Sequence, residues 1–337
     1  MRYLEEVHRS AVIRTLLVVA ALAIGFGFLV HAVPWSDRCA AAGVTVAACP
    51  SSALEPGLRT VLSTMDATLL GAGALVYALG AVCWTWRWQR VLAVTAVRPS
   101  FLVLFRASIE AYAAMVLFVG GIGGDAVRFG VLVAEGLSAS WATASLAVDR
   151  VVGLSALLAT GLLVAAPELV ALHPVAIVAL PALLLALVGG LLVALVAPLP
   201  RILPVVLVRI VVALRGPYGA VGARAGVRAL VEAFAVSLLV ATTQLGAFSL
   251  FLAAAHVSVA SPAKLVAGIV EAFIVNAIPT VPGGWGTGEA AFVFFLRPAG
   301  VGEAQSLAAS VAFRLSVLPV AAVGVVSLAL RARRKRP

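Results

Sequence analysis

The sequence predicts an all-α polytopic membrane protein built as an inverted-topology repeat, with about six full transmembrane helices and two re-entrant helical hairpins. Three observations predict this fold. The 337 residues are 63% hydrophobic and only 11% charged, with a mean hydropathy of +1.13, whereas a soluble domain carries roughly 25% charged residues. The apolar residues form long segments. Two glycine-rich breaks, related by a constant offset, interrupt the apolar chain.

Six apolar segments are nearly free of charge at their centres. They lie at residues 16–32, 69–82, 145–166, 175–197, 233–255 and 308–330. A helix needs about 20 apolar residues to cross ~30 Å of hydrocarbon, and most of these segments reach that length alone or with their flanks. Because lipid offers no hydrogen bonds to the backbone, each segment is expected to be a helix. The first segment lacks a clean small-residue cleavage pattern, which favours a retained helix over a signal peptide.

The positions of Lys and Arg predict the orientation. The net charge is +10, and basic residues gather at 87–106, 198–228 and in the tail 331–336. Such segments stay on the cytoplasmic side, so both termini are expected in the cytoplasm, at a bacterial cytoplasmic membrane. Topology explains the charge without a nucleic-acid partner. The charge-balanced loop 34–65 is expected outside, where oxidation can occur and the pairing of Cys39 with Cys49 is left open.

Two breaks divide the apolar chain. The first reads Gly-Gly-Ile-Gly-Gly-Asp-Ala-Val-Arg at 120–128, and the second reads Pro-Thr-Val-Pro-Gly-Gly-Trp-Gly-Thr-Gly-Glu at 279–289. Short apolar arms flank each break, at 101–119 and 129–133 and at 265–278 and 290–296. Gly and Pro at this density interrupt a helix. The simplest structure is a re-entrant hairpin, which a membrane tolerates only when it is buried in protein or lines a wet cavity.

The two breaks are related by one offset. Asp125 and Glu289 are 289 − 125 = 164 positions apart, and so are Arg150 and Arg314. The same shift carries Gly120 onto Gly284, Gly124 onto Gly288 and Gly136 onto Gly300. We therefore predict two repeats, 1–166 and 175–337, within a single transmembrane domain 1–337. Chance alignment of helices with biased composition is the alternative.

The repeats are expected to have opposite orientations. Three full crossings, near 140–166, 175–197 and 229–256, separate the two breaks. An odd number means that the first hairpin enters from the cytoplasm and the second from outside. Inverted repeats are the architecture of many transporters, with the site near the bilayer midplane where broken helices meet.

Four acidic residues are candidates for binding a proton or forming ion pairs. Asp125 and Glu289 each follow a glycine at the start of a new helix, Asp149 lies beside Arg150, and Glu271 has no charged residue one helical turn away. One interpretation of the first two is helix capping, worth about 1 kcal/mol. The other is function, since a carboxylate deep in a bilayer is costly unless it is paired.

Three arginines are candidates for binding a phosphate group. Arg150 and Arg314 lie about ten residues into apolar helices, and Arg128 follows Asp125 by three positions. A guanidinium can hold phosphate through two parallel hydrogen bonds, and snorkelling to the interface is the alternative. Backbone N–H groups of glycines before a helix add an anion site. These glycines are Gly121, Gly123, Gly124, Gly284, Gly286 and Gly288.

Several enzyme classes find no support. The four histidines are isolated, so metal-ligand spacing is absent, and neither a phosphate-binding Walker loop nor a nucleophile elbow occurs. The run Gly121-x-Gly123-x-x-Ala126 lacks the strand–turn–helix context of a dinucleotide site. Trp84, Trp86 and Trp88 are interpreted as an aromatic belt at the inner interface. We expect no catalytic residues, no metal and no cofactor.

With these motifs in hand, the chain resembles the lysylphosphatidylglycerol synthase membrane-domain family, the flippase-like proteins. The resemblance rests on the run 120–128, on Asp149-Arg150, on the run 279–289 and on Arg314. It implies a domain that moves an aminoacylated phospholipid across the membrane while a separate cytosolic domain makes that lipid. Only a short basic tail follows Leu330, so a separate lipid-modifying synthase is the partner that the resemblance allows. The first break lacks the prolines of the second.

The leading hypothesis is a lipid translocase, a flippase or scramblase. Its substrate would be a phosphate-bearing lipid, such as an aminoacylated phospholipid or a polyprenyl-phosphate sugar. One alternative is a membrane-embedded transferase that acts on a lipid carrier, with Asp125 or Glu289 as general base. Another alternative is a small-solute secondary transporter, which the same fold allows.

Overall fold

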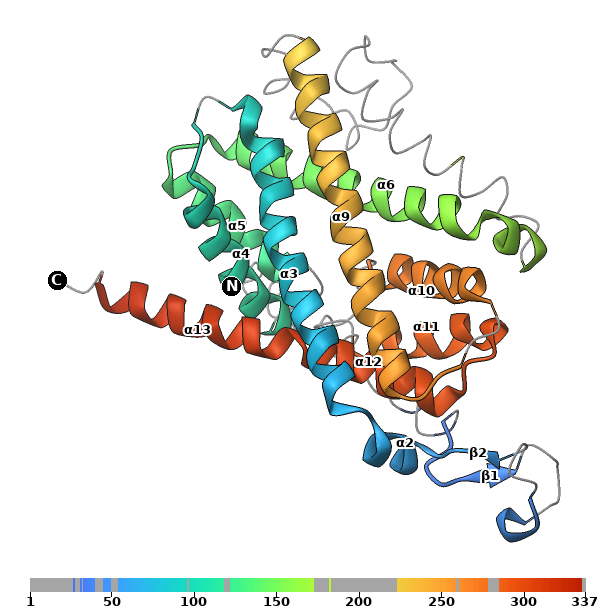
Figure 1. Cartoon of the computed structure of the whole chain (residues 1–337). Coiled ribbons are helices and arrows are strands. Elements are labelled where there is room, and N and C mark those ends of the chain that lie inside the picture. Colours follow the sequence, from blue (N-terminus) through green and yellow to red (C-terminus); the bar gives the residue numbers. More distant parts are fainter. Residues whose placement is uncertain are drawn as a thin grey trace, which may run out of the picture. The chain divides into compact units, whose positions relative to one another are not determined.

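The computed structural model describes residues 27, 31, 33–39, 45–49, 54–95, 97–117, 122–172, 182, 223–258, 261–277 and 285–334 (Figure 1). Most residues of the predicted apolar segments 16–32 and 175–197 lie outside the described ranges. Residues 198–222 of the basic segment 198–228 lie outside them as well. So do Gly120 and Gly121 of the first break and residues 278–284 of the second.

The chain divides into two compact units. Unit 1 consists of Met1–Gly73, Met115–Gly123 and Phe248–Leu315, and unit 2 consists of Ala74–Ala114, Gly124–Ala247 and Ser316–Pro337. Each candidate site described below lies within one unit.

Four segments of the described chain are long and apolar enough to cross a membrane. They are Ala67–Val94, Ala139–Val164, Ala225–Ala254 and Glu303–Arg331. The corresponding helices are α3 (Ala67–Val91), α6 (Ala139–Leu172), α9 (Ala223–Ala254) and the pair α12 (Glu303–Leu315) and α13 (Val317–Arg334). They confirm the four predicted apolar segments that fall on described residues, three as single helices and the last as the pair α12 and α13.

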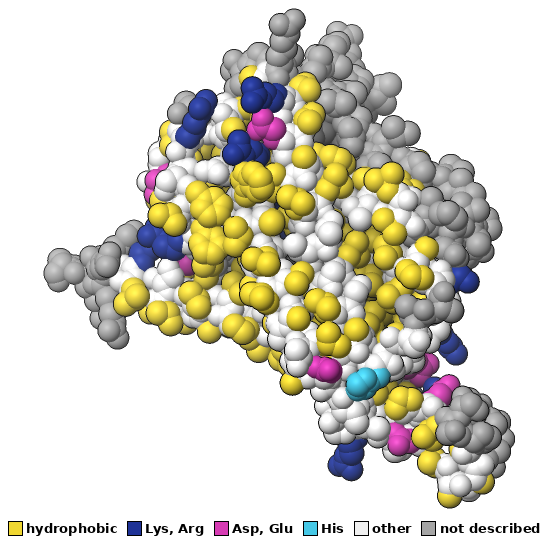
Figure 2. All heavy atoms as spheres, viewed as in Figure 1, with side chains coloured by type: hydrophobic (Ala, Val, Ile, Leu, Met, Phe, Trp, Pro, Cys, Tyr) yellow, Lys and Arg dark blue, Asp and Glu magenta, His cyan; other side chains and the backbone are white. Residues whose placement is uncertain are grey.

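The exposed sides of these helices are apolar, which is the surface that lipid requires. Leu75 and Leu79 on α3 and Val231 on α9 are more than half exposed, and Figure 2 shows hydrophobic side chains spread over such surfaces. A soluble protein would cover this much apolar surface. The protein is therefore a multi-pass helical membrane protein.

The last predicted helix is interrupted. The sequence predicts one helix over 308–330, but α12 ends at Leu315 and α13 begins at Val317. Pro319 explains the break, because it has no N–H to donate to the Leu315 carbonyl and its ring clashes with that carbonyl.

Unit 2 contains two helices too short to be full spans. They are α4 (Phe101–Leu117) and α5 (Ile122–Ala134). Buried side chains from both pack around Trp88 of α3 and Leu146 of α6. A second apolar cluster joins α3, α6 and α9 through Val91, Val148 and Ala233. The sequence predicts that the first break precedes the new helix, but Gly123 and Gly124 lie inside the first turn of α5.

Unit 1 contains the equivalent short helices, α10 (Pro262–Asn276) and α11 (Thr287–Leu296), followed by the 3₁₀ turn η4 (Arg297–Ala299). The two helices pack side by side, and α11 also packs against α12. Ser261 caps α10 by accepting a hydrogen bond from the Lys264 N–H at 3.3 Å. Membrane insertion of α4–α5 and α10–α11 as re-entrant hairpins stays a prediction.

The loop expected outside the membrane forms a small stapled structure in unit 1. Strands β1 (Arg38–Cys39) and β2 (Leu54–Glu55) pair antiparallel. A disulfide joins Cys39 to Cys49, beside the 3₁₀ turn η1 (Val46–Ala48), which resolves the pairing that the sequence leaves open. Helix α2 (Leu58–Thr64) follows.

The Gly57 N–H donates to the Asp37 carboxylate at 2.8 Å and lowers the pKa of Asp37, with a further contribution from Thr60.

Candidate functional site

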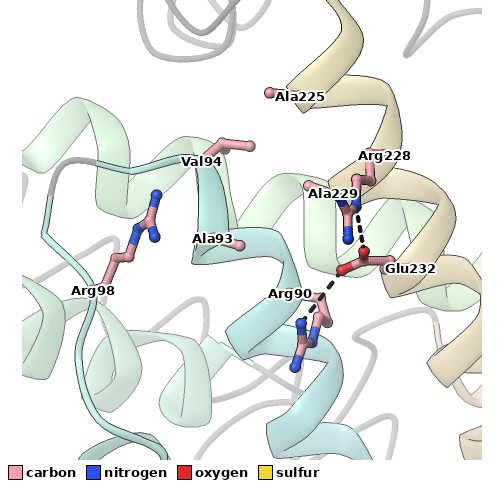
Figure 3. Close-up of a pocket in the computed structure, with 8 residues that line it drawn as sticks. All are labelled: Arg90, Ala93, Val94, Arg98, Ala225, Arg228, Ala229 and Glu232. Carbon is pink, nitrogen blue, oxygen red and sulfur yellow. Dashed lines mark hydrogen bonds and ion pairs between the residues drawn. The ribbon is translucent and has the colours of Figure 1, made fainter.

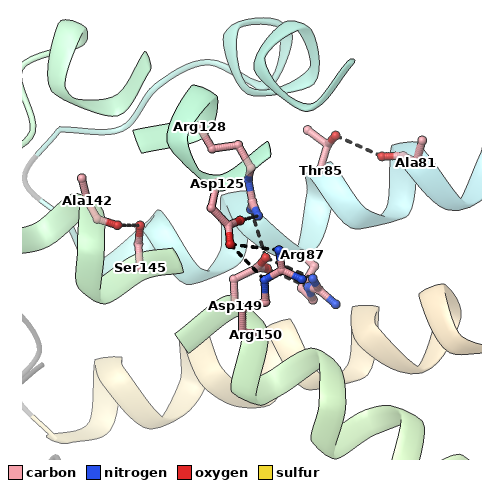
Figure 4. A network of polar contacts seen from close by, with 9 residues as sticks. All are labelled: Ala81, Thr85, Arg87, Asp125, Arg128, Ala142, Ser145, Asp149 and Arg150. Atoms are coloured by element: carbon pink, nitrogen blue, oxygen red, sulfur yellow. Dashed lines mark hydrogen bonds and ion pairs between the residues drawn. The ribbon is translucent and has the colours of Figure 1, made fainter. Parts of the chain in front are cut away.

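A buried ion triad lies at the centre of the candidate site in unit 2 (Figure 4). The Asp149 side chain on α6 is fully buried and contacts two guanidiniums. Arg87 of α3 donates from Nε and Nη2 to its two oxygens at 2.7 and 3.1 Å, and Arg128 of α5 donates from Nη2 at 3.0 Å. Removing one partner from such a group leaves an uncompensated buried charge. The triad therefore ties α3, α5 and α6 together.

Local sequence features make room for the triad. Gly153 lies one turn after Asp149, and a Cβ there would lie 2.5 Å from Arg87 Nη1, so glycine lets this arginine lie across α6. The Arg128 guanidinium lies over the rings of Trp84 and Trp88, with its Cζ 4.7 and 4.0 Å from the ring centres. The faces of aromatic rings attract cations at this range.

These contacts correct two predictions. Trp88 is fully buried, and Trp84 joins it in enclosing Arg128, so only Trp86, which is partly exposed, suits an aromatic belt at the interface. Arg87, the first residue of the basic segment 87–106, is also more than the topological charge predicted from sequence. It is buried because Asp149, 62 positions along the chain, compensates its charge.

A second, more open ion pair adjoins the triad. Arg150 donates from Nη2 and Nε to one oxygen of Asp125 at 2.9 and 3.2 Å. The side chains of Arg150 and Asp125 are 48% and 29% exposed. Arg128 Nη1 lies 3.6 Å from the other oxygen of Asp125, so these two residues, one turn apart on α5, are also paired. The five charged groups comprise three guanidiniums and two carboxylates, so the cluster carries one net positive charge.

The corresponding ion pair in unit 1 is almost completely buried. Arg314 of α12 forms an ion pair through Nε with Glu289 of α11, and the two side chains are only 15% and 2% exposed. Arg314 also donates from Nη2 to the Asn276 amide oxygen at 3.0 Å, while the Asn276 amide group donates to the Ala272 carbonyl at 2.9 Å. The three elements α10, α11 and α12 therefore meet at one guanidinium.

The glycines of the second break are needed mainly for their backbone conformation and for their lack of a side chain. Gly286 precedes α11 with a φ of +83°, a conformation that favours glycine, and its N–H donates to Glu289 at 2.6 Å. That N–H is therefore occupied by protein, contrary to the predicted anion site at this glycine. A Cβ at Gly288 would overlap both Arg314 and Asn276, so glycine is required for their approach. Gly121 and Gly284 lie outside the described residues.

The 164-residue offset relates the two ion pairs. Asp125 and Glu289 both lie in the first turn of a short helix, and Arg150 and Arg314 both lie on the next long segment. Each arginine is eleven residues into its span, since 150 − 139 = 314 − 303 = 11. At 1.5 Å per residue this is roughly 17 Å of helix, close to half of a ~30 Å hydrocarbon core.

The buried triad has an apolar counterpart at the same offset. The shift carries Arg87, Arg128 and Asp149 onto Phe251, Phe292 and Phe313, and it carries Trp84 onto Phe248. The contacts correspond as well. Phe248 stacks on Phe292 with ring centres 4.1 Å apart, as Trp84 lies over Arg128. Two of these positions therefore pack together in each half, in unit 2 as a guanidinium over an aromatic ring and in unit 1 as two stacked aromatic rings.

Glu110 of α4 is another buried acid, and local sequence spacing predicts only one of its three partners. Arg106 lies four positions before Glu110 in the sequence, a spacing that predicts an ion pair on one helix face, and its Nε lies 3.8 Å from the Glu110 carboxylate. Two further donors come from α13, with Ser327 Oγ at 2.8 Å and Arg331 Nη1 at 3.1 Å. These partners lie more than 200 positions away, so no local spacing predicts them. Glu271 lies partly buried on α10, and its role in the site stays a prediction.

The chemistry of both clusters is that of guanidinium–carboxylate pairs. Among the residues that the structure describes, no group of three His, Cys, Asp or Glu side chains has the arrangement of a metal site. The fold and these clusters define a multi-pass helical membrane protein with ion pairs buried in its spanning helices.

Comparison with known families assigns the chain more closely. A family model described as the lysylphosphatidylglycerol synthase TM region matches residues 56–324, so the chain belongs to this family, which is associated with lipid handling. The match includes both breaks and both ion pairs. No curated protein matches the sequence significantly.

Proposed function

We propose that the protein is a lipid translocase, a flippase or scramblase, of the bacterial cytoplasmic membrane. Its substrate is a phosphate-bearing lipid, such as an aminoacylated phospholipid or a polyprenyl-phosphate sugar. The observation that carries the proposal is the half-exposed Arg150, paired with Asp125 midway along a spanning helix. Membership of a family associated with lipid handling supports the same function.

The geometry of the open pair suits exchange with phosphate. Arg150 directs two nitrogen donors at a single carboxylate oxygen, whereas a phosphate offers a separate oxygen to each donor. The surrounding cluster carries one net positive charge, so an anionic headgroup compensates it. Asp125 then compensates Arg150 whenever the site is empty, which lowers the cost of an unpaired charge in the membrane.

The pair Arg314–Glu289 is the second binding position in this proposal. Its lower exposure corresponds to the closed form of a site whose counterpart in unit 2 is open. Alternate opening of the two positions moves a headgroup from one leaflet to the other. An inverted repeat, which the shared offset supports, provides this alternation without a different fold for each state.

Transport in liposomes tests the proposal. The full chain is reconstituted with a fluorescent phospholipid, and the rate at which the label changes leaflets is measured. Arg150→Gln and Arg314→Gln each remove a charged hydrogen-bonding group worth about 1.5–3 kcal/mol, so the rate is expected to fall about ten- to hundredfold.

Arg59→Gln is the matched control, because Arg59 is an exposed arginine on α2, outside both pairs. Its rate is expected to equal that of the unmodified protein. Equal rates for Arg150→Gln, Arg314→Gln and the unmodified protein would remove both proposed binding positions. Formation of a new lipid product by the purified protein would instead support the transferase alternative.

A further inference from the structure

A basic cavity in unit 2 is lined by residues that belong to neither ion pair. It has a volume of about 410 Å³ and is enclosed by the end of α3, the start of α9 and the connection that leads to α4 (Figure 3). Its charged lining consists of Arg90, Arg98, Arg228 and Glu232, and the other lining residues are alanines and Val94. Three guanidiniums and one carboxylate give the cavity a net charge of +2.

The ends of two candidate membrane spans put the cavity at the expected depth of the lipid headgroups. One membrane span ends at Val94 and another begins at Ala225, and both residues line the cavity. Because the end of a span meets the lipid headgroups, a ligand here lies at the level of the phosphates. The concentration of basic residues predicts that this end faces the cytoplasm.

Some N–H donors of these arginines have no partner among the described residues. Glu232 lies between two of them, with Arg228 Nε at 2.8 Å and Arg90 Nη1 at 3.4 Å. Arg90 Nε is buried and has no hydrogen-bond partner among the residues that the structure describes. Within the described part of the chain Arg98 makes no hydrogen bond or ion pair, and Figure 3 shows it on the opposite side of Ala93 from the Glu232 group. The single carboxylate therefore pairs with two of the three guanidiniums.

We propose that this cavity binds the phosphate of an anionic phospholipid from the cytoplasmic leaflet. A phosphodiester placed among the three guanidiniums receives charge-assisted hydrogen bonds and competes with Glu232 for two of them. Partly exposed Trp86 on α3, with Val227 and Val231 on α9, provides an apolar surface near the cavity for the acyl chains. The inference goes beyond the proposed function and does not depend on transport.

Lipid binding to the purified full chain tests this inference. Native mass spectrometry in neutral detergent measures binding of phosphatidylglycerol, with phosphatidylcholine as the neutral comparison. Arg98→Gln is expected to weaken phosphatidylglycerol binding roughly fivefold, since exposed charges contribute up to ~1 kcal/mol. Glu232→Gln removes the competing carboxylate and is expected to tighten binding by a similar factor. Opposite effects from two single substitutions cannot both come from misfolding.

Matched controls separate the sources of phosphate. Arg59→Gln, the same charge change on α2, is expected to leave binding unchanged, and inorganic phosphate at the same concentration is not expected to displace the lipid. Phosphatidylcholine binding as tight as phosphatidylglycerol, or equal affinity in Arg98→Gln and the unmodified chain, would overturn the site. Displacement by inorganic phosphate at equal affinity would overturn its assignment to a lipid.

The two proposals fail separately. Arg150→Gln is expected to slow transport and to keep phosphatidylglycerol bound in this cavity. A protein that shows no transport at all still gives a complete result in the binding measurement.

Discussion

Arg314 of α12 is paired with Glu289 in the first turn of α11, and a shift of 164 positions converts this pair into Arg150 and Asp125, which are also paired. The acid in each pair comes from the start of a short helix, and the arginine comes from the following long segment. Two distant parts of the sequence therefore form the same contact. Equivalent contacts support a repeat more strongly than matching residue types do, because biased composition alone does not bring matched residues into contact.

Loss of Asp149 is expected to destabilise the protein strongly. Asp149→Ala leaves Arg87 and Arg128 as buried charges without their common partner, which costs about 3–5 kcal/mol. Thermal unfolding in detergent measures the effect. Glu55→Gln is the control, since its pair with Arg38 is about half exposed and contributes less than about 1 kcal/mol. Equal stability of the two variants would show that the triad is not a structural element.

An apolar replacement of the whole triad is expected to be tolerated better than the loss of one member. The variant carries Arg87→Phe, Arg128→Phe and Asp149→Phe, the residue type at all three corresponding positions in unit 1. Replacing a complete buried ion group by packed apolar residues is often neutral or stabilising. We expect this variant to unfold at a higher temperature than Asp149→Ala. A lower unfolding temperature would show that the backbone around the triad does not accept the aromatic packing.

A methyl group at Gly288 is expected to disrupt the closed ion pair. Gly288→Ala places a Cβ where Arg314 and Asn276 lie, so one of them must move. In the liposome assay we expect the transport rate to fall about tenfold, as for loss of one charged hydrogen bond. Gly130→Ala on α5 is the matched control, because nothing lies within 4 Å of its added Cβ. A similar fall in both variants would contradict the steric role of Gly288.

The disulfide between Cys39 and Cys49 is expected to determine which cysteines a thiol reagent labels. In a Cys83→Ser background, Cys39 and Cys49 are joined and do not react with a membrane-impermeant maleimide. After mild reduction of intact cells, two thiols per chain are expected to label from outside. Labelling without reduction would contradict the disulfide, and labelling only after the membrane is permeabilised would contradict the predicted orientation.

Acid is expected to loosen the same loop. The pKa of Asp37 in the folded protein is lower than its ordinary value of 3.8, chiefly because the Gly57 N–H donates to it. A lowered folded pKa gives stability that is present above the unfolded pKa and is lost as pH falls through the folded pKa. The protection of the Gly57 amide against hydrogen exchange, measured relative to the intrinsic exchange rate at each pH, should therefore fall below about pH 4. In Asp37→Asn this dependence on pH should disappear.

The sequence predicted much of the candidate site through its repeat. Four described spans follow from apolar length, and the shared offset matched Asp125 with Glu289 and Arg150 with Arg314 as candidate site residues. Which acid contacts which arginine came from the structure. Local spacing also predicted Arg106–Glu110. It did not predict that Arg331 contacts Glu110, because the two are 221 positions apart and the contact depends on how α13 packs on α4.

The sequence by itself determined that this protein is built in a membrane, since lipid imposes apolar length and internal backbone hydrogen bonding on every crossing. It also determined which acids and arginines correspond. Only the tertiary structure decided that Arg87 is buried beside Asp149 and that two tryptophans enclose Arg128. The physical reason is that the cost of burying a charge depends on partners that other helices supply, and the order of residues along one helix does not contain that information.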